Sequence, residues 1–483
     1  MLTTFKFYKK IFSNLNKNKE FMSQGNKKFH YKDIKKFFIS FNKLLLFTNG
    51  KQLRICTLSK KSFFLYSSII SILISKNVWI PLDENLSKEI ITYILKTTKC
   101  DIILIDKENE KKFKSLLLKL KIKYVNIENI KINYKKIYNF KFNKNYKDND
   151  LAMIFFTSGS TGMPKGVEIT NRNFISCFSG QIKHIYKKTS SNNLVFGDYH
   201  NTSFIISIVI LIPCIFNCNK ITATNKYEEN LYLLDHIKVN KVNCIITTPS
   251  TIKRLKIFYN KFPKINLKIL ILCGELFHSS DLKFIKKYLK PKYIFNCYGS
   301  TEVSPWVFAY QFNNKDIKEI ENMGLVPIGR NFFNTKFKIN KKKILLVKGD
   351  MTAKYINSKK NYGNKFWYNT KDKVKIVNKL FYVTGRSDSV IKLRGFRIDI
   401  KSIETQIRKF DLIKDCHVFI SNEKIVAAVI IKKRNINQLK DYLIKSLPYY
   451  MVPKEFKIYN DFPLNKSHKI NYKFIKEDYT RTQ

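Results

Sequence analysis

A short stretch rich in glycine, hydroxyl and lysine side chains, residues 157–166 (TSGSTGMPKG), has the residue types that bind phosphate. Glycines let backbone N–H groups close around an anion, the hydroxyls donate further hydrogen bonds, and Lys165 adds a positive charge. The apolar run 153–156 before it and the run 167–170 after it predict a loop between two strands. It is not a Walker A motif, because proline precedes the lysine and a strand follows. Taken alone, the stretch could be an ordinary surface turn.

Two more polar clusters come directly after predicted strands. Residues 273–276 (CGEL) follow the apolar run 267–272, and residues 298–302 (YGSTE) follow 293–296. The carboxyl ends of parallel strands are where open α/β sheets bind ligands, and a glutamate placed there can hold a metal ion against phosphate oxygens. Each cluster alone is a commonplace turn. Three phosphate-compatible loops in one chain favour a nucleotide site.

Length and composition limit the class of protein. The chain has 483 residues, 44% of them apolar, so we expect two or three domains with a large core. The formal net charge is +54, yet only 10 of the 90 basic residues are arginine. Lysine spread evenly beside isoleucine and asparagine is typical of AT-rich coding sequence and a solvated surface. A selected role in binding a polyanion or a membrane surface is the alternative. A basic face would still attract acidic proteins and nucleotides.

Cysteine usage and hydropathy indicate a compartment. The nine cysteines form no CxxC pair, and several lie in apolar runs, as expected of reduced thiols in a cytosolic protein. The N-terminus lacks the charged-then-apolar pattern of a signal peptide. The longest apolar run, residues 204–216, contains Pro213 and is too short to span a bilayer. We expect a cytoplasmic protein with no membrane span.

Helix and strand signals alternate along the first half of the chain. Helical spacing appears at residues 29–46, 62–74 and 87–99, strand patterns at 53–58 and 101–105, a helix from 173 and a buried helix at 203–216. This alternation predicts doubly wound α/β subdomains. The lysine- and asparagine-rich segment 107–150 is expected at the surface. Residues 244–250 read as a strand ending in a helix start. The run 267–298 reads as a β-α-β unit whose helix is capped by Ser279 or Ser280.

The pattern changes near residue 324. Short strands predict a β-rich subdomain, followed by a basic hairpin at 382–399 and a small α/β domain at 400–483. Five motifs, at 157–166, 298–302, 368–372, 385–399 and 463–469, resemble in order and spacing those of the adenylate-forming (AMP-binding) superfamily. The motifs at 79–83, 273–276, 327–330 and 447–453 look most like free-standing peptide-synthetase-type adenylation domains and D-alanine–carrier-protein ligase. The resemblance covers about residues 25–478.

The resemblance implies an α/β fold with a large N-terminal domain, residues 1–387, made of doubly wound subdomains plus a distorted β-barrel. A small mobile α/β C-terminal domain, residues 388–483, would act as a lid. The implied reaction joins a carboxylate to ATP, giving acyl-AMP and pyrophosphate, and then passes the acyl group to a thiol. Positioning and charge neutralisation carry such chemistry without a covalent enzyme nucleophile. ATP and Mg²⁺ are the implied cofactors.

The site residues are carried over position by position. The phosphate cradle would comprise Thr157, Ser158, Gly159, Ser160, Thr161, Gly162 and Lys165. The AMP site would comprise Gly274, Glu275, Tyr298, Gly299, Ser300, Asp372 and Arg386, with Tyr298 stacking on adenine and Asp372 taking the ribose hydroxyls. Thr301 would contact the α-phosphate, Glu302 would hold Mg²⁺, and Lys469 would be the adenylation lysine. Asp388 falls at the hinge position.

The acyl pocket departs from the pattern of amino-acid-activating members. They carry an aspartate that pairs with the substrate ammonium, whereas Ile205 stands at that position here. An apolar side chain cannot offset the desolvation of an ammonium. The substrate is therefore an acid without that contact, or Asp198 or Glu275 replaces the aspartate. The matched pocket positions are Ile205, Ile206, Val209, Cys273, Cys297 and Trp306, which favour a small or aromatic apolar acyl group. In two milder departures, Lys371 and His468 stand where the family has glycine.

The acceptor and the alternatives complete the prediction. The chain ends soon after Lys469, so we expect a free-standing enzyme that serves a separate acyl or peptidyl carrier protein, or CoA. Carriers of this kind are typically acidic, which suits a basic enzyme. A degenerate homologue that only binds nucleotide is a second hypothesis, opposed by the intact Lys165, Glu302 and Lys469. Nucleic-acid binding through bulk charge lacks the expected arginine clusters. The identity of the acid stays open.

Overall fold

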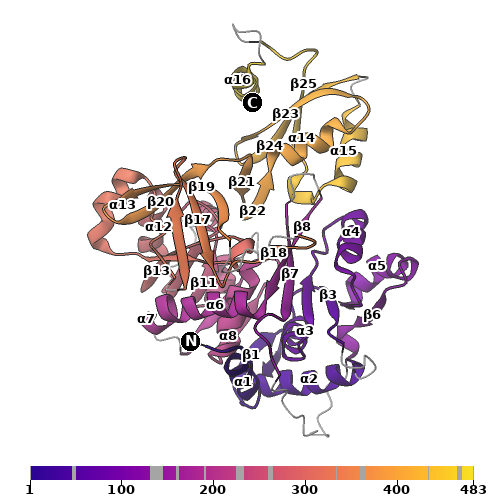
Figure 1. Ribbon diagram of the computed structural model, residues 1–483, viewed down its shortest axis with the longest axis vertical. Helices are drawn as coiled ribbons and strands as arrows, with labels where there is room; N and C mark the ends of the chain where they lie inside the picture. The colour runs from indigo at the N-terminus through magenta and orange to yellow at the C-terminus, as the bar shows by residue number, and fades with distance from the viewer. Residues whose placement is uncertain are drawn as a thin grey trace. The chain divides into compact units, whose positions relative to one another are not determined.

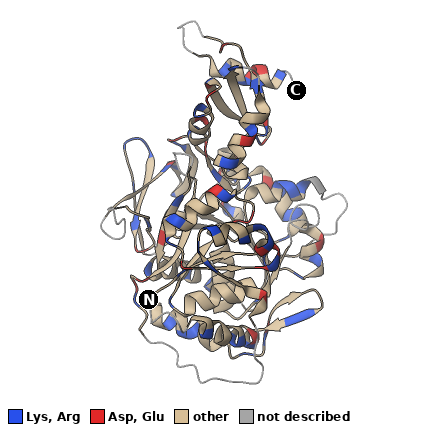
Figure 2. Ribbon diagram, turned by 90° about the vertical axis from the view of Figure 1, so that its right-hand side faces the viewer, with Lys and Arg blue, Asp and Glu red and all other residues tan. Residues whose placement is uncertain are grey.

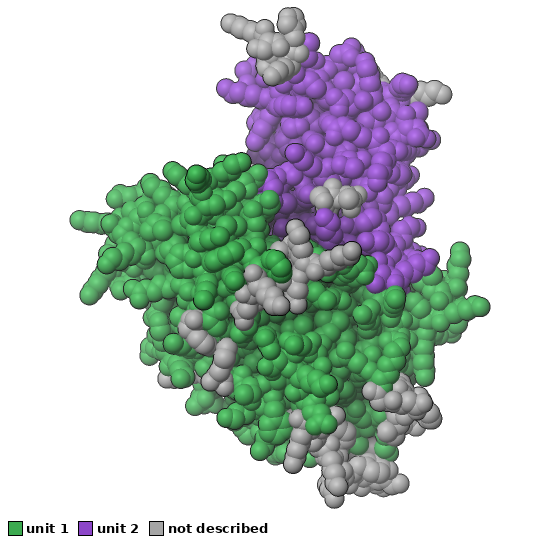
Figure 3. Space-filling model, in the orientation of Figure 1, with its two compact units in different colours: residues 1–84, 98–156, 166–387 green, residues 85–97, 157–165, 388–483 purple. Residues whose placement is uncertain are grey.

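A computed structural model describes residues 2–45, 51–130, 145–158, 163–189, 192–224, 233–258, 265–332, 334–358, 366–432, 435–464 and 470–481. The chain falls into two compact units, coloured separately in Figure 3. The first comprises residues 1–84, 98–156 and 166–387, and the second comprises residues 85–97, 157–165 and 388–483. The second unit thus takes in two short segments that we expected to lie wholly within the N-terminal domain.

A nine-stranded sheet has the order β15-β14-β13-β12-β11-β9-β10-β1-β2. Its strands are β1 (Glu20–Gln24), β2 (Lys27–His30), β9 (Val195–Asp198), β10 (Lys220–Ala223), β11 (Cys244–Thr247), β12 (Ile269–Cys273), β13 (Tyr293–Tyr298), β14 (Phe308–Gln311) and β15 (Arg330–Asn331). Strands β9 to β13 pair in parallel, while β2, β14 and β15 are antiparallel. Every residue of β11 and β12 is buried, as continuous apolar runs predict for parallel strands covered on both faces.

A seven-stranded sheet has the order β18-β8-β7-β4-β3-β5-β6. Its strands are β3 (Arg54–Leu58), β4 (Val78–Pro81), β5 (Ile102–Ile105), β6 (Lys123–Asn126), β7 (Leu151–Thr157), β8 (Lys165–Thr170) and β18 (Lys354–Tyr355). Strands β7 and β8 flank the glycine-rich stretch, so the predicted placement of that loop between two strands is confirmed.

Helices accompany both sheets (Figure 1). In the first unit they are α1 (Thr4–Asn14), α2 (Tyr31–Leu45), α3 (Phe63–Ile74), α5 (Lys107–Lys119), α6 (Asn171–Gln181), α7 (Lys187–Thr189), α8 (Ile206–Phe216), α10 (Leu233–Val239), α11 (Pro249–Phe258), α12 (Ser280–Phe284) and α13 (Ile317–Met323). Helices α3 and α8 are buried along almost their whole length, as expected of helices that are apolar on nearly every face. Among the described residues, no helix combines the length and apolar character needed to cross a membrane.

A curled antiparallel sheet completes the first unit. It consists of β16 (Thr335–Ile339), β17 (Ile344–Gly349), β19 (Tyr368–Val377) and β20 (Leu380–Arg386). The predicted fold class is confirmed, with this four-stranded sheet in place of the expected distorted barrel. The described part of segment 107–150 lies largely at the surface, as expected, but it also forms α5 and β6, and α5 buries Phe113 and Leu117.

The second unit has a core of its own, formed by residues of 398–451. Its elements are most of α4 (Lys88–Thr98), the hairpin β21 (Val390–Leu393) and β22 (Phe396–Asp399), α14 (Ile400–Arg408), β23 (Ile413–Ser421), β24 (Lys424–Ile431), α15 (Ile436–Ser446), β25 (Glu455–Ile458) and α16 (Tyr472–Arg481). Strands β23, β24 and β25 make a three-stranded sheet.

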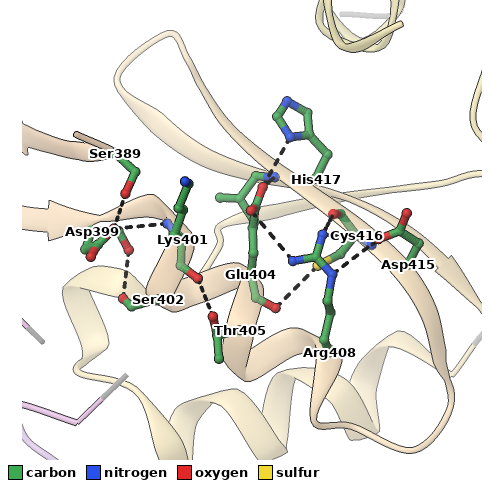
Figure 4. A network of polar contacts seen from close by, with 11 residues as sticks. Ser389, Asp399, Lys401, Ser402, Glu404, Thr405, Arg408, Asp415, Cys416 and His417 are labelled. Carbon is green, nitrogen blue, oxygen red and sulfur yellow. Dashed lines mark hydrogen bonds and ion pairs between the residues drawn. The ribbon is translucent and has the colours of Figure 1, made fainter. Parts of the chain in front are cut away.

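Polar contacts fasten α14 to β23 (Figure 4). Glu404 accepts a hydrogen bond of 2.9 Å from the Val418 N–H and lies 3.2 Å from Nδ1 of His417. Arg408 reaches Asp415 at 3.1 Å. Burial would raise the pKa of Glu404, but hydrogen bonds from His417 and Val418 outweigh it and hold the pKa below its usual value. The network fixes α14 against the sheet of this unit.

Candidate functional site

Three of the predicted nucleotide residues meet around one carboxylate. Tyr298 donates from its hydroxyl to Oδ2 of Asp372 at 2.5 Å, and Arg386 lies 2.6 Å from Oδ1. Asp372 and Arg386 are register partners on β19 and β20, while Tyr298 ends β13. Burial and the neighbouring Asp372 raise the pKa of Tyr298 well above its ordinary value, so the phenol stays a donor. Each carboxylate oxygen has a second lone pair, so the cluster can still accept hydrogen bonds from a ligand.

The backbone of Lys371, within β19, explains why this position favours glycine. It has φ of 64°, in the left-handed region that costs an ordinary residue about 1–2 kcal/mol. Its carbonyl accepts from the N–H of Ser387 at 2.8 Å, which joins β19 to the residue after β20 beside Asp372. The departure at Lys371 therefore costs conformational energy but leaves the carboxylate in place.

Glu302 lies in a tight turn after β13. It is 1% exposed, and Tyr355 donates to its Oε1 at 2.6 Å. Gly299 opens the turn, where a Cβ would fall 1.9 Å from the carbonyl oxygen of Pro305. Among the described residues no group of three or more His, Cys, Asp or Glu side chains could hold a metal. A single carboxylate fits Mg²⁺, which usually takes one or two carboxylates and fills its other positions with phosphate oxygens and water.

Gly274 and Glu275 directly follow β12. Gly274 has φ of 83°, which glycine adopts without strain. Glu275 accepts from the N–H and the hydroxyl of Ser250 at 2.8 and 3.0 Å, at the start of α11. A carboxylate there is favoured by the free N–H groups of the first helical turn. Glu275 thus holds α11 against β12.

Several of the predicted phosphate-binding and catalytic residues are not described in the structure. Gly159, Ser160, Thr161, Gly162 and Lys469 lie outside the described residues. Thr157 and Lys165 stand at the facing ends of β7 and β8, and the Thr157 hydroxyl is 3.4 Å from the Lys165 carbonyl oxygen.

Ser158, Ser300, Thr301 and Asp388 are described. Ser158 follows β7, Ser300 and Thr301 open the turn of Glu302, and Asp388 begins the last segment of the second unit.

The predicted acyl-pocket residues belong to one core. Cys273 and Cys297 are register partners on β12 and β13, and Val209 and Trp306 are buried in the same cluster. Ile205 and Ile206, at the start of α8, are half-buried against it. Burial raises the pKa of Cys297 well above its ordinary value, so the thiol stays protonated. None of these six side chains carries a charge at neutral pH.

Asp198, one proposed replacement for the missing aspartate, already has partners. Tyr66 donates to Oδ2 at 2.5 Å, and Nζ of Lys61 lies 3.6 Å from Oδ1. Lys61 and Asp198 are 8% and 2% exposed, so the sheet carrying β9 is joined to the segment after β3 by a buried ion pair. The sequence offered no signal for Lys61, which is one lysine in a lysine-rich chain.

Asp198→Ala is expected to lower the free energy of unfolding by about 3 kcal/mol, because it leaves the Lys61 ammonium buried without its counter-charge. Urea unfolding followed by circular dichroism measures the change. Lys61→Met in the Asp198→Ala background should restore much of the loss. A double variant as unstable as the sum of both single variants would contradict the pairing.

Known proteins agree with this architecture. A model of the AMP-binding enzyme family matches residues 14–350. The chain therefore belongs to this family of adenylate-forming enzymes, and the prediction of an AMP-forming acid–thiol ligase is confirmed at that level. A D-alanine–D-alanyl carrier protein ligase of Staphylococcus aureus is 24% identical over 422 residues, 83% of this chain and 84% of the relative.

Solved structures share the fold. The Vibrio cholerae adenylation domain AlmE, in complex with glycyl-adenosine-5'-phosphate, matches with a TM-score of 0.83 and 18% identity, over 100% of this chain and 99% of that one. The o-succinylbenzoate CoA synthetase MenE of Bacillus subtilis matches with a TM-score of 0.78 and 16% identity, over 97% and 98%. Both matches extend through the second unit as well as the first.

Proposed function

We propose that the enzyme activates a carboxylic acid with ATP, forming acyl-AMP and pyrophosphate, and then transfers the acyl group to the phosphopantetheine thiol of a separate carrier protein. In the first step a carboxylate oxygen bonds to the α-phosphorus as the bond to pyrophosphate breaks. In the second, the thiol sulfur bonds to the acyl carbon and AMP leaves. The observation that carries the proposal is the buried cluster of Tyr298, Asp372 and Arg386.

Each site residue has a proposed part in the first step. Asp372, held by Tyr298 and Arg386, would accept hydrogen bonds from the ribose hydroxyls, and the Tyr298 ring would face adenine. Gly274, Glu275, Gly299 and Ser300 would line the nucleotide site. The cradle of Thr157 to Lys165 would hold the β- and γ-phosphates and Thr301 the α-phosphate. Glu302 would hold Mg²⁺, which neutralises phosphate charge when bound.

The lid would supply the remaining charge. We propose that residues 388–483 move about Asp388 and bring Lys469 to the α-phosphate during adenylation. An ammonium placed where anionic charge accumulates stabilises that transition state more than the ground state.

The substrate would be an acid without an α-ammonium contact. Ile205 cannot pair with an ammonium, Asp198 is neutralised by Lys61, and Glu275 is engaged by Ser250 at the start of α11. This would separate the enzyme from the S. aureus relative, whose name specifies D-alanine.

A carrier protein is the favoured acceptor and CoA the alternative. Lys and Arg are spread over both units (Figure 2), and the formal net charge is +54, so an acidic carrier would be attracted over much of the surface. The S. aureus relative is named as a carrier-protein ligase, whereas MenE is named as a CoA synthetase. Loading of an acidic holo-carrier should fall steeply with salt, whereas transfer to CoA should fall less.

Carboxylate-dependent ATP–pyrophosphate exchange tests the proposal. Purified enzyme is screened against amino acids, aryl acids and short to medium acyl acids. We expect exchange with at least one acid that lacks an α-amino group and little with D-alanine. Exchange confined to α-amino acids would overturn the substrate class. Silence across the whole panel, with ATP still bound, would favour a degenerate nucleotide-binding homologue.

A further inference from the structure

The helix beside the predicted acyl pocket is irregular. Helix α6 continues into a π-helical turn, Ile182–Tyr186, whose wider hydrogen-bonding pattern inserts an extra residue. Helix α6 packs on α8, and the π-helical turn packs on β14, the strand paired with β13. π-Helical turns persist despite poorer hydrogen bonding and recur at functional sites. Helix α6 thus adjoins α8, which carries Ile206 and Val209, and the turn adjoins β14, the neighbour of the strand that carries Cys297.

Hydrogen bonds tie α6 to a predicted pocket residue. The thiol of Cys177 lies 3.4 Å from the carbonyl oxygen of Trp306, and the Gln181 amide donates to the same sulfur at 3.4 Å. Cys177 and Gln181 are four residues apart and therefore share one face of the helix. That face is turned to the core that holds the predicted acyl pocket.

Two buried polar atoms on this wall lack a partner. Within the described part of the chain, neither Oη of Tyr186 nor Oε1 of Gln181 has a hydrogen-bond partner. The two residues are 3% and 2% exposed. Leaving such a group unsatisfied typically costs about 1–3 kcal/mol, so a fold that keeps two of them implies something that pairs with them.

The surroundings limit what that partner can be. Burial raises the pKa of the Tyr186 phenol well above its ordinary value. The titratable groups that add to this shift are the thiols of Cys244, Cys297 and Cys214. Among the described residues, neither a cation nor a carboxylate acts on this phenol, so a charged ligand group would be buried here without a counter-charge. A neutral hydroxyl can donate its one hydrogen to the amide oxygen of Gln181 and accept a hydrogen bond from the phenol of Tyr186. It also suits the amide in either orientation.

We infer that the acid activated by this enzyme carries an uncharged hydroxyl group on an otherwise apolar body, and that Tyr186 and Gln181 recognise that hydroxyl. The inference rests on the proposed function, because it assigns the substrate class of the same acyl pocket. Tyr186 and Gln181 are specificity-determining residues, outside the set that the sequence motifs single out.

The test compares acids that differ only in one hydroxyl. The pairs are para-hydroxybenzoate with benzoate, β-hydroxybutyrate with butyrate, and ω-hydroxyhexanoate with hexanoate. For at least one pair we expect kcat/KM in ATP–pyrophosphate exchange to favour the hydroxylated acid by roughly 10- to 100-fold, since binding of the unsubstituted acid leaves buried polar groups unpaired. Tyr186→Phe should bring that ratio close to one by slowing only the hydroxylated acid, and Gln181→Met should lower it.

Tyr382→Phe is the matched control. Tyr382 is also fully buried on β20, and its hydroxyl likewise has no partner among the described residues, but β20 belongs to the curled sheet. Tyr382→Phe should keep the wild-type ratio. Both Tyr→Phe variants remove a partnerless oxygen, so neither should lower the melting temperature. An unchanged ratio in Tyr186→Phe, or an equal loss for both acids of a pair, would overturn the inference.

Binding measured without ATP separates this inference from the proposed function. Calorimetric titration of the same pairs should show tighter binding of a hydroxylated acid, lost in Tyr186→Phe. That result would support the hydroxyl site even if no acid gave exchange, in which case only the proposed reaction would fail. Exchange with unsubstituted acids and no preference in any pair would mean that water alone fills the site, and would overturn the inference.

Discussion

Lys469→Ala is expected to lower ATP–pyrophosphate exchange by about 100- to 1,000-fold, the usual cost of removing one group that stabilises developing charge. Lys469 lies outside the described residues, but its flanks are placed. Leu464 and Ile470 form an antiparallel bridge, and the Asn471 N–H donates to the Pro463 carbonyl at 2.7 Å. The ends of this segment are thus fixed to each other in the second unit.

The same segment of the sequence supplies the control for Lys469. Lys466 is three positions earlier, carries the same charge and has no proposed role, so Lys466→Ala should leave exchange within about twofold of wild type. Transfer from a preformed acyl-adenylate to the acceptor thiol should survive Lys469→Ala, because the adenylated phosphate already exists in that step. Equal losses in both half-reactions, or in both lysine variants, would contradict the role given to Lys469.

The parallel strands could be predicted because strands buried on both faces have continuous apolar runs in their local sequence. Strands β11, β12 and β13 are apolar runs followed by polar residues. This pattern is typical of parallel strands that helices cover on both faces. The family resemblance assigned Cys273 and Cys297 to one site, and the two residues are register partners on adjacent parallel strands. Lys371 was recognised as a departure from glycine, and its positive φ gives the physical reason.

Other features depend on partners far away in the chain. Lys61 is buried only because Asp198, 137 residues later, accepts it, and no local pattern marks one lysine among many. In α5, frequent lysines obscured the Phe113 and Leu117 spacing that buries one face. The π-helical turns at 182–186 and 285–289 are differences of hydrogen-bond register, to which periodicity is insensitive. The burial of Tyr186 could not have been predicted from sequence.

Removing the carboxylate of Asp372 should cost both stability and nucleotide binding. Asp372→Ala leaves the Arg386 guanidinium, 13% exposed, without its counter-charge and the Tyr298 hydroxyl without its acceptor. Loss of one partner of a buried pair typically costs about 3–5 kcal/mol. We expect a fall of that size in the free energy of unfolding, measured with urea, and a loss of ATP binding measured by calorimetry.

Asp316→Ala is the matched control for Asp372→Ala. Asp316 also accepts a tyrosine hydroxyl, from Tyr310 at 2.6 Å, but it has no part in the proposed nucleotide site. Its variant should lose about 1 kcal/mol of stability and bind ATP normally.

A second change separates the two roles of Asp372. Arg386→Met added to Asp372→Ala removes the stranded cation, so the double variant should regain stability relative to the single one. It should still fail to bind ATP, because the proposed acceptor of the ribose hydroxyls is absent. If ATP binding returned together with stability, Asp372 would be a structural partner of Arg386, and the nucleotide would have to be recognised by other residues.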